Sequence, residues 1–396
     1  MITAITNARI FDGERVIDDH IVVIDGAHIH AVGGVVPVGA TVIDAHGATL
    51  MPGLIDAHVH SDMECLRDML LFGVTTALEM MGQWTEQEHK ELTERDDIAD
   101  ARFPGWGITP PGGHPSEYWS DRDHEHGDFV FPFVSTPDEA TKHIADLVAE
   151  GVDYIKIFLE DGTILGTPGL PVLNNETLLT AVREAHRYNK IAIAYVTTAA
   201  ATQQVITAGV DGLAHVFIDR PHTPELIAAI VTSGAFVIPT LTVCSSAISN
   251  TGAVLVDDER VSSKLSKKWL DSLNVSMNCY PQGNMAYVLA TVTALHKAGV
   301  DILAGTDVSD IPGGGAPGVS LHRELQLLVA AGLTPTEALR AATATPARRF
   351  GLTDRGRIVS GARADLLLID GDPITNITDT LSIRNIWRRG VRLTPL

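Results

Sequence analysis

The chain has few cysteines and few basic residues. Its 396 residues include three cysteines, Cys65, Cys244 and Cys279, and none of them belongs to a C-x-x-C pair. An odd number of widely separated cysteines excludes a disulfide framework and suits a reducing compartment, so we expect a cytoplasmic protein.

Lys and Arg number 29 against 49 Asp and Glu, which gives a net charge of −20. An acidic surface repels phosphate backbones and anionic lipids, so neither nucleic acid nor a membrane is an expected partner.

Long uninterrupted hydrophobic runs are also lacking. The first residues, MITAITNARIFDG, contain no basic segment followed by an apolar one, so no secretory leader is expected. The most apolar stretch, residues 226–243, is interrupted by Thr232, Ser233, Gly234 and Pro239. We interpret it as a helix, a turn and a buried strand rather than as a membrane span.

Both ends of the chain have the pattern of short antiparallel strands. Residues 1–50 alternate apolar and polar side chains between turn signals, and residues 362–393 do the same. We therefore predict that residues 1–52 and 350–396 join into one composite β-sandwich domain, and that residues 53–349 form a second domain.

The middle of the chain alternates strand-like and helix-like segments. Apolar runs such as YIKIFLE, KIAIAYV and GLAHVFI alternate with helical patterns such as TPDEATKHIADLVAEG and NETLLTAVREAHRYN. No glycine-rich phosphate-binding fingerprint follows the first strand, so the pattern predicts an α/β fold of the distorted (β/α)8, TIM-like barrel type rather than a dinucleotide-binding sheet. The glycine cluster at residues 311–318 lacks the Gly-Lys-Ser/Thr of a phosphate-binding loop. We interpret it as a flexible loop over the barrel mouth.

Five polar side chains end the predicted barrel strands. His58 and His60 follow LIDA and lie two residues apart, which on a strand places both on one face. Lys156, His215 and Asp307 end later strands in the same way. Functional groups of such a barrel lie at the carboxyl ends of its strands, and histidine and carboxylate suit Zn²⁺. These five residues therefore predict a metal site on one rim.

Two other His-x-His pairs are weaker candidates. His28 and His30 fall in the N-terminal β-region, away from the rim, and His124 and His126 fall in the acidic segment DRDHEHGD. We interpret both pairs as surface residues, with adventitious metal binding as an alternative for the second pair.

Lys156 stands among Ile and Phe in a predicted strand. Burial disfavours the ammonium form, and the neutral amine is the form that reacts with CO₂ to give a carbamate. The alternative is a buried ion pair between Lys156 and a carboxylate such as Glu160.

The order and spacing of several strings resemble one family over nearly the whole chain. PGLIDAHVH, VDYIKIF, AGVDGLAHV, LAGTD and GARADLLLIDGDP follow the pattern of the amidohydrolase superfamily, and within it of the imidazolonepropionase- and prolidase-like branch. The resemblance implies a TIM-like barrel with a flanking β-sandwich. It also implies a divalent metal centre, most simply Zn²⁺, that activates water to hydrolyse an amide, cyclic amide or dipeptide-like bond of a small-molecule substrate.

The resemblance also implies roles for single residues. His58, His60 and Asp307 would hold a first ion, and Lys156, carboxylated by CO₂, would bridge to a second ion held by His215. Asp307 would in addition accept the proton of the attacking water and pass it to the leaving nitrogen. His114, in PPGGHP, would help to bind the oxyanion.

One position departs from the pattern of that branch. Tyr195 in KIAIAYV stands where the branch has a further histidine ligand, at the end of the fifth strand. Three outcomes are open: Tyr195 binds metal as a phenolate, the centre holds one ion, or the centre is inactive. One bound Zn²⁺ is sufficient for hydrolysis, so the departure bears more on the number of ions than on the reaction.

The residues after the second and third predicted strands suggest the substrate. This part of the chain is rich in aromatic and thioether side chains: Met80, Met81, Trp84, Trp106, Tyr118 and Trp119. Loops at the top of a barrel form its pocket, so an apolar or aromatic substrate is expected.

Two functions are alternatives to the hydrolysis of a carbon–nitrogen bond. They are a lactone or ester hydrolase on the same metal centre and a catalytically impaired binding protein. Members of this branch often self-associate, so a homo-oligomer is a further expectation.

Overall fold

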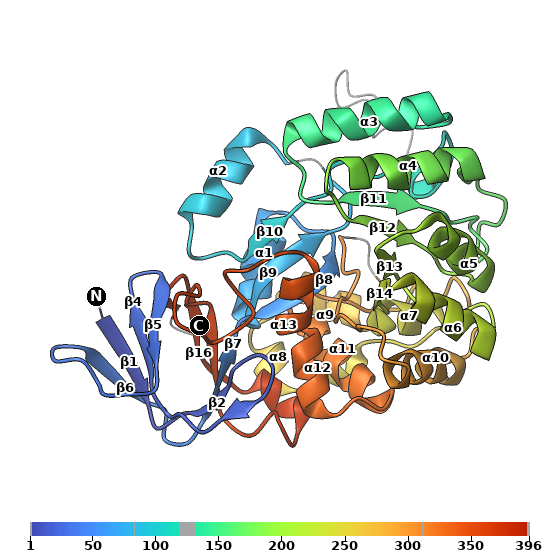
Figure 1. Cartoon of the computed structure of the whole chain (residues 1–396). Coiled ribbons are helices and arrows are strands. Elements are labelled where there is room, and N and C mark those ends of the chain that lie inside the picture. The colour runs from blue at the N-terminus through green and yellow to red at the C-terminus, as the bar shows by residue number, and fades with distance from the viewer. Residues whose placement is uncertain (1, 83, 119–130, 311–312, 394–396) are drawn as a thin grey trace.

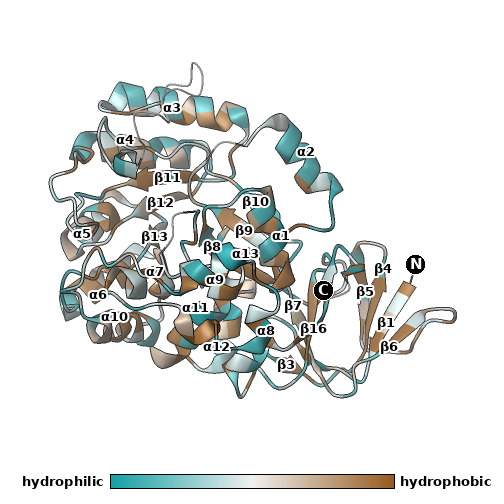
Figure 2. Cartoon of the chain, turned by 180° about the vertical axis from the view of Figure 1, so that it is seen from behind, coloured by the Kyte–Doolittle hydropathy of each residue, from teal (hydrophilic) through white to brown (hydrophobic). Residues whose placement is uncertain are grey.

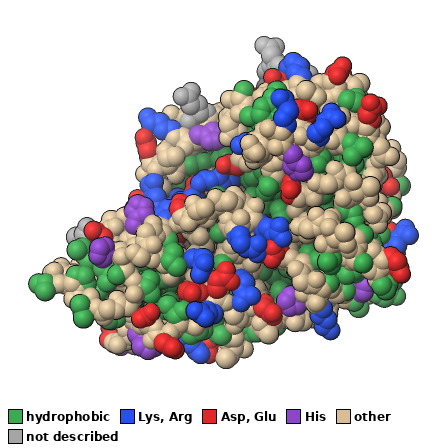
Figure 3. Space-filling view, in the orientation of Figure 1, with side chains coloured by type: hydrophobic (Ala, Val, Ile, Leu, Met, Phe, Trp, Pro, Cys, Tyr) green, Lys and Arg blue, Asp and Glu red, His purple; other side chains and the backbone are tan. Residues whose placement is uncertain are grey.

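The computed structural model describes residues 2–82, 84–118, 131–310 and 313–393. Figure 1 shows two parts, a helix-rich barrel and a β-rich region that contains the first strands and the last ones. In Figure 2 the barrel strands are mostly hydrophobic, whereas the outer helices carry hydrophilic faces. On the face in Figure 3, acidic and basic side chains are interspersed over the barrel. Among the described helices, none is both long and apolar enough to cross a membrane.

The β-rich region is a sandwich of two sheets. The first sheet has the strand order β5-β4-β1-β6, with bounds β1 (Ile2–Thr6), β4 (Val22–Asp25), β5 (His28–Val32) and β6 (Thr41–Asp44). The second sheet has the order β17-β16-β15-β7-β2-β3, with bounds β2 (Arg9–Phe11), β3 (Val16–Ile17), β7 (Thr49–Pro52), β15 (Leu366–Ile369), β16 (Ile383–Arg388) and β17 (Val391–Leu393). The antiparallel pairing of β7 with β15 joins the two ends of the chain. Ile5, Ile10, Leu50, Leu366 and Trp387 form the core of the sandwich, and the predicted composite β-sandwich is confirmed.

The barrel is built from parallel strands. They are β8 (Leu54–Val59), β9 (Val74–Glu79), β10 (Asp100–Arg102), β11 (Ile155–Phe158), β12 (Ala192–Tyr195), β13 (Gly212–Ala214) and β14 (Phe236–Ile238). The segment of residues 302–304 occupies the eighth position. Leu303 N donates to Val237 O of β14, and Ala57 N of β8 donates to Ala304 O. The predicted TIM-like barrel is therefore confirmed, although its eighth segment makes only isolated bridges and is not a regular strand.

Helices cover the barrel. Their bounds are α1 (Met63–Leu71), α2 (Glu86–Glu94), α3 (Pro137–Glu150), α4 (Asn175–Arg187), α5 (Ala199–Ala208), α6 (Pro224–Ser233), α7 (Leu241–Ala247), α8 (Glu259–Ser262), α9 (Lys267–Leu273), α10 (Met285–Lys297), α11 (Val319–Ala330), α12 (Pro335–Ala341) and α13 (Ala344–Arg349). Short 3₁₀ turns span Ser116–Tyr118, Ala253–Leu255 and Ile377–Leu381. Local sequence sets several helix starts: in α3, Thr136 and Glu139 form a capping box around Pro137.

The predicted strand at residues 235–243 is only partly correct. β14 ends at Ile238, and α7 begins at Leu241 after Thr240, whose φ is 46°. The buried carboxylate of Glu324 in α11 accepts hydrogen bonds from the backbone N–H groups of Leu241 and Thr242, at 2.9 and 2.8 Å. A carboxylate at a helix start satisfies amides that lack a partner within the helix. Pro239 ends the strand, and a carboxylate 82 residues away in sequence caps the helix that follows.

A buried ion cluster joins the barrel to the C-terminal segment. Asp100 in β10 contacts the guanidinium groups of Arg355, Arg363 and Arg388. Burial would raise the pKa of Asp100, but these guanidinium groups hold it well below its usual range. The carboxylate therefore contributes stability above the ordinary Asp pKa near 4, and this stability is lost as the pH falls below that value.

We expect Asp100→Asn to lower the free energy of unfolding by about 3–5 kcal/mol at neutral pH, because three buried guanidinium groups lose their shared counter-charge. Urea denaturation followed by circular dichroism measures this change. The control is Asp97→Asn, which removes an exposed partner of Arg95 and should change stability by less than about 1 kcal/mol. Equal effects of the two substitutions would contradict the prediction.

Candidate metal centre

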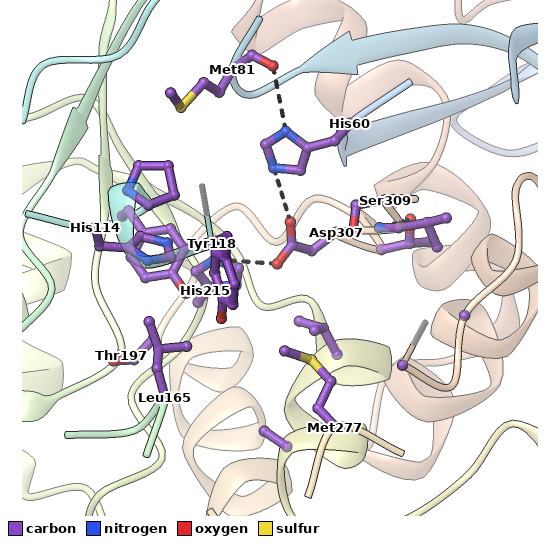
Figure 4. Close-up of a pocket in the computed structure, with 18 of the residues that line it drawn as sticks. His60, Met81, His114, Tyr118, Leu165, Thr197, His215, Met277, Asp307 and Ser309 are labelled. Carbon is purple, nitrogen blue, oxygen red and sulfur yellow. Dashed lines mark hydrogen bonds and ion pairs between the residues drawn. The ribbon is translucent and has the colours of Figure 1, made fainter. Parts of the chain in front are cut away.

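The barrel brings the five predicted polar residues to one rim. β8 carries His58, and His60 follows its last residue; β11 carries Lys156. His215 directly follows β13, and Asp307 follows the eighth segment. Figure 4 shows His60, His215 and Asp307 around one cavity.

Asp307 is the centre of the cluster. One carboxylate oxygen, Oδ1, lies 3.1 Å from His58 Nε2 and 3.2 Å from His60 Nε2, and the other, Oδ2, lies 3.7 Å from His215 Nε2. Single donor atoms of His58, His215 and Asp307 lie within 4.8 Å of one another. This spacing suits three ligands of one ion.

Close backbone packing positions Asp307 against His58. Both Thr306 N and Asp307 N donate to His58 O, at 3.1 and 2.7 Å. A Cβ atom at Gly305 would lie 2.9 Å from His58 N, so glycine is required for this approach. Asp307 and His215 have φ values of 57° and 74°, a region that costs non-glycine residues about 1 kcal/mol or more. Such conformations are typical of functional sites.

Hydrogen bonds set the orientation of two imidazoles. His215 Nδ1 donates to Thr240 Oγ1 at 2.6 Å, because the Thr240 hydroxyl itself donates to Pro239 O at 2.8 Å. His60 Nδ1 faces Met81 O at 3.5 Å. Both contacts leave the Nε2 lone pair directed toward Asp307, as a metal ligand requires. The sequence reasoning missed Thr240, and Thr-Leu-Thr after a short apolar run contains no signal for this role.

We expect Thr240→Val to weaken metal affinity about 10–100-fold, because His215 loses the acceptor that orients its ring. Competition against a chromophoric chelator measures the affinity. Thr240→Ser retains the hydroxyl and is the matched control, which should stay near the parent value. A Val variant that binds metal as tightly as the Ser variant would contradict the assignment.

The cluster fits a divalent cation. Among the described residues, the buried side-chain nitrogens without a hydrogen-bond partner include His58 Nδ1, His215 Nε2 and Lys156 Nζ. Each such group costs about 1–3 kcal/mol when left unsatisfied, a cost that a bound ion would offset. Burial and the nearby Lys156 lower the pKa of His58 to about 3, so its imidazole is neutral. Burial would raise the pKa of Asp307, but the imidazoles hold it well below its usual range. The neutral imidazole of His58 and the ionised carboxylate of Asp307 are ligand forms that Zn²⁺ binds.

Among the described residues, no carboxylate forms an ion pair with Lys156. Burial lowers the pKa of its amine to about 7, and Nζ lies 5.4 Å from the ring centre of Phe158 and 5.5 Å from that of Tyr195. The alternative pairing with Glu160 is not formed, because Glu160 accepts instead from Thr197 Oγ1 and Gly162 N.

Tyr195 ends β12 and packs between two histidines. Its ring centre lies 4.2 Å from that of His215 and 4.6 Å from that of His114. Burial raises the pKa of the phenol well above 10, so the hydroxyl stays protonated unless a cation lies beside it. His114 Nδ1 in turn lies 2.5 Å from Glu117 Oε1. The structure thus places the two remaining predicted site residues, His114 and Tyr195, beside the metal-ligand cluster.

A cavity of about 450 Å³ opens beside the cluster. Met81, Trp106 and Tyr118 line it, as the sequence predicts. Two predictions are wrong: Met80 is fully buried in the barrel core, and Trp84 packs against Phe103 with ring centres 4.8 Å apart. Neighbouring residues at a strand end point in opposite directions, which explains the different positions of Met80 and Met81.

The remaining predicted segments fall in three places. His28 and His30 lie in β5 of the sandwich. Gly313 and Gly315 of the glycine cluster line the cavity. Trp119, His124 and His126 lie outside the described residues.

A metal-ligand cluster at the carboxyl ends of barrel strands defines a class of metal-dependent barrel hydrolases. The sequence profile of the amidohydrolase family matches residues 49–393, and that of the NagA composite domain matches residues 3–50. The chain therefore belongs to the amidohydrolase family, and its barrel with a composite β-sandwich is the fold of that family.

Individual proteins extend this likeness. The chain is 37% identical over 103 residues to an imidazolonepropionase of Deinococcus deserti, a match that covers 25% of each chain. It is 28% identical over 263 residues to an ochratoxinase of Aspergillus niger, covering 64% of this chain and 48% of the relative. The chain thus spans a quarter to a half of the length of these relatives.

Solved structures share the fold over the whole chain. A Xaa-Pro dipeptidase with bound methionine superposes with a TM-score of 0.76 at 21% identity and covers 100% of both chains. Phenylurea hydrolase B superposes with a TM-score of 0.78 at 20% identity, covering 100% of this chain and 97% of the other.

Proposed function

We propose that the protein hydrolyses a carbon–nitrogen bond, in an amide, cyclic amide or dipeptide-like small molecule with an apolar or aromatic group. The observation that carries the proposal is the convergence of His58, His215 and Asp307 with buried, unpartnered imidazole nitrogens beside the cavity. Membership in the amidohydrolase family supports it. So do the names of two similar solved structures, a Xaa-Pro dipeptidase and a phenylurea hydrolase.

Each site residue has a proposed task. His58, His60 and Asp307 would hold a first divalent ion, and His215 would hold a second one, with carboxylated Lys156 and Tyr195 as its further ligands. When bound, the ion supplies an activated water and polarises the substrate carbonyl. Asp307, ionised and within reach of three imidazoles, accepts the proton of the water on a carboxylate oxygen and passes it to the leaving nitrogen. His114, held by Glu117, faces the substrate carbonyl oxygen from the opposite wall.

The test combines metal analysis with a substrate panel. The protein is purified without chelator, its metal content is measured by elemental analysis, and hydrolysis of amides, dipeptides, lactones and esters is followed with and without chelator. Chelator-sensitive hydrolysis of amides above esters is the expected result. Metal-free protein that no added Zn²⁺ converts into a hydrolase would overturn the proposal in favour of a binding protein, and preference for lactones would overturn the choice of bond.

The number of metal ions per chain depends on whether Tyr195 is a ligand. If the phenolate is a ligand, the parent protein holds two ions per chain, and Tyr195→Phe holds about one because a ligand of the second ion is gone. Elemental analysis of the two proteins measures the difference. Tyr195→His is the matched replacement by a neutral nitrogen ligand and should restore two ions. Equal occupancy in the parent and the Phe variant would contradict the ligand role.

A further inference from the structure

The cavity is an apolar slot with aromatic rings, tilted or edge-on to one another, along one side. His114 lies 4.6 Å from Tyr195, 5.5 Å from Phe158 and 5.7 Å from Tyr118 between ring centres, so four rings make one continuous wall. Leu165 and Met277 also line the cavity, and Figure 4 shows them at the end away from His60. The cavity thus has metal-ligand residues at one end and aromatic rings along one side. This arrangement suits a substrate with a carbonyl at the ligands and a planar group along the rings.

The mouth of this slot is acidic. Asp62, at the start of α1, and Asp310 both line the cavity, and with Cys65 they place donor atoms within 4.8 Å of one another. Asp310 also forms an ion pair with exposed Lys268 at 2.8 Å. Lys268 therefore balances the charge of Asp310, and the charge of Asp62 remains at the mouth. None of the described residues that line the cavity is Lys or Arg.

An anionic substrate would meet two penalties in this slot. Its carboxylate would lose water against the ring wall without a hydrogen-bonding cation, and it would pass the charge of Asp62 at the mouth. An uncharged aromatic ring meets neither penalty and gains from contact with the rings of Phe158 and Tyr118. The cavity therefore discriminates by charge as well as by shape.

We infer that the substrate is an aromatic amide without a carboxylate group, whose carbonyl lies at the metal ligands and whose ring lies along the wall of His114, Tyr118, Phe158 and Tyr195. This inference rests on the proposed carbon–nitrogen hydrolysis and narrows its substrate class. Asp62 at the mouth is the residue that excludes anionic substrates.

Two isosteric substrates test the inference on the full-length, Zn²⁺-loaded protein. 4-Acetamidobenzamide and 4-acetamidobenzoate share the same acetyl group and planar ring, and differ in a neutral amide against a carboxylate. Release of the two arylamines is followed by chromatography. We expect kcat/KM for the neutral compound to exceed that for the anionic one by at least about tenfold, because the carboxylate is buried without a counter-charge.

Removal of the charge of Asp62 tests whether this residue excludes anionic substrates. Asp62→Asn retains an N-cap residue of similar strength for α1 and should raise the ratio of anionic to neutral kcat/KM by at least about twofold. Asp257→Asn, an exposed residue that does not line the cavity, is the matched control and should leave the ratio unchanged. Equal ratios in these two variants would overturn the role of Asp62.

The outcomes separate this inference from the proposed function. Equal or faster turnover of the carboxylate compound would overturn the inference and leave the hydrolase intact. Chelator-sensitive cleavage of a dipeptide such as Gly-Phe, with neither anilide cleaved, would do the same. Failure of the loaded protein on every amide would overturn the proposed function itself.

Discussion

Asp307→Asn should abolish most of the activity. The substitution keeps the size and shape of the side chain but removes the charge that faces His58, His60 and His215. The amide is a poor metal ligand and does not accept the proton of water. Loss of proton transfer alone corresponds to about 10²–10⁴-fold in kcat, and loss of a ligand lowers metal occupancy in addition. Elemental analysis and steady-state hydrolysis of a responsive amide measure both effects.

The control for this variant addresses folding. The metal-free Asn variant should still unfold cooperatively, at a temperature somewhat below that of the metal-free parent, because the imidazoles lose the carboxylate that they stabilise. Thermal denaturation followed by circular dichroism provides this comparison. An Asn variant with parental metal content and parental kcat would contradict the proposed role of Asp307 as ligand and base.

Lys156→Met should produce the second large loss. Met fills the space between Phe158 and Tyr195 that the lysine stem occupies, so packing is retained while the amine is removed. If the amine carries a carbamate ligand, the variant should lose one of two ions and about 100-fold or more in activity. The parent protein incubated with ¹³C-bicarbonate should give a carbamate signal by carbon NMR that the Met variant lacks. The absence of that signal from the active parent would contradict carboxylation.

Carboxylation of Lys156 should depend on pH in a defined direction. The pKa of the amine is lowered to about 7 by burial, so the neutral form dominates above pH 7 and its fraction falls about tenfold for each unit below. Reactivation of metal-free protein by Zn²⁺ with bicarbonate should therefore rise between pH 6 and 8. The Met variant, without an amine, is the control and should show no response to bicarbonate.

Much of the site could be predicted from short stretches of sequence. His58 and His60 follow an apolar run, and the period of two along a strand places them on one face. His215 and Asp307 were predictable because each ends an apolar run and the ends of parallel strands share one edge, and Lys156 because it interrupts an apolar strand. The structure brings all five to this edge. Their proposed roles as ligands and base remain predictions for the experiments above.

Other features depend on contacts between residues far apart in sequence. Glu324 accepts hydrogen bonds from the amides of Leu241 and Thr242 at the start of α7, next to Thr240, which contacts His215. Pro239 is a local signal that breaks a strand, but nothing in the residues after it indicates that a helix begins at Leu241. Met80 and Trp84 were assigned to the cavity because composition alone does not say which way a side chain points.

By itself the sequence determined the barrel, the sandwich made from both chain ends and the set of groups at the rim, because periodicity and strand ends are local properties of the backbone. Only the tertiary structure decided that Glu160 contacts Thr197 and not Lys156, that Thr240 orients His215, and that four rings form one wall of the cavity. These properties depend on distances between elements, which are set by how side chains fill the space between strands and helices.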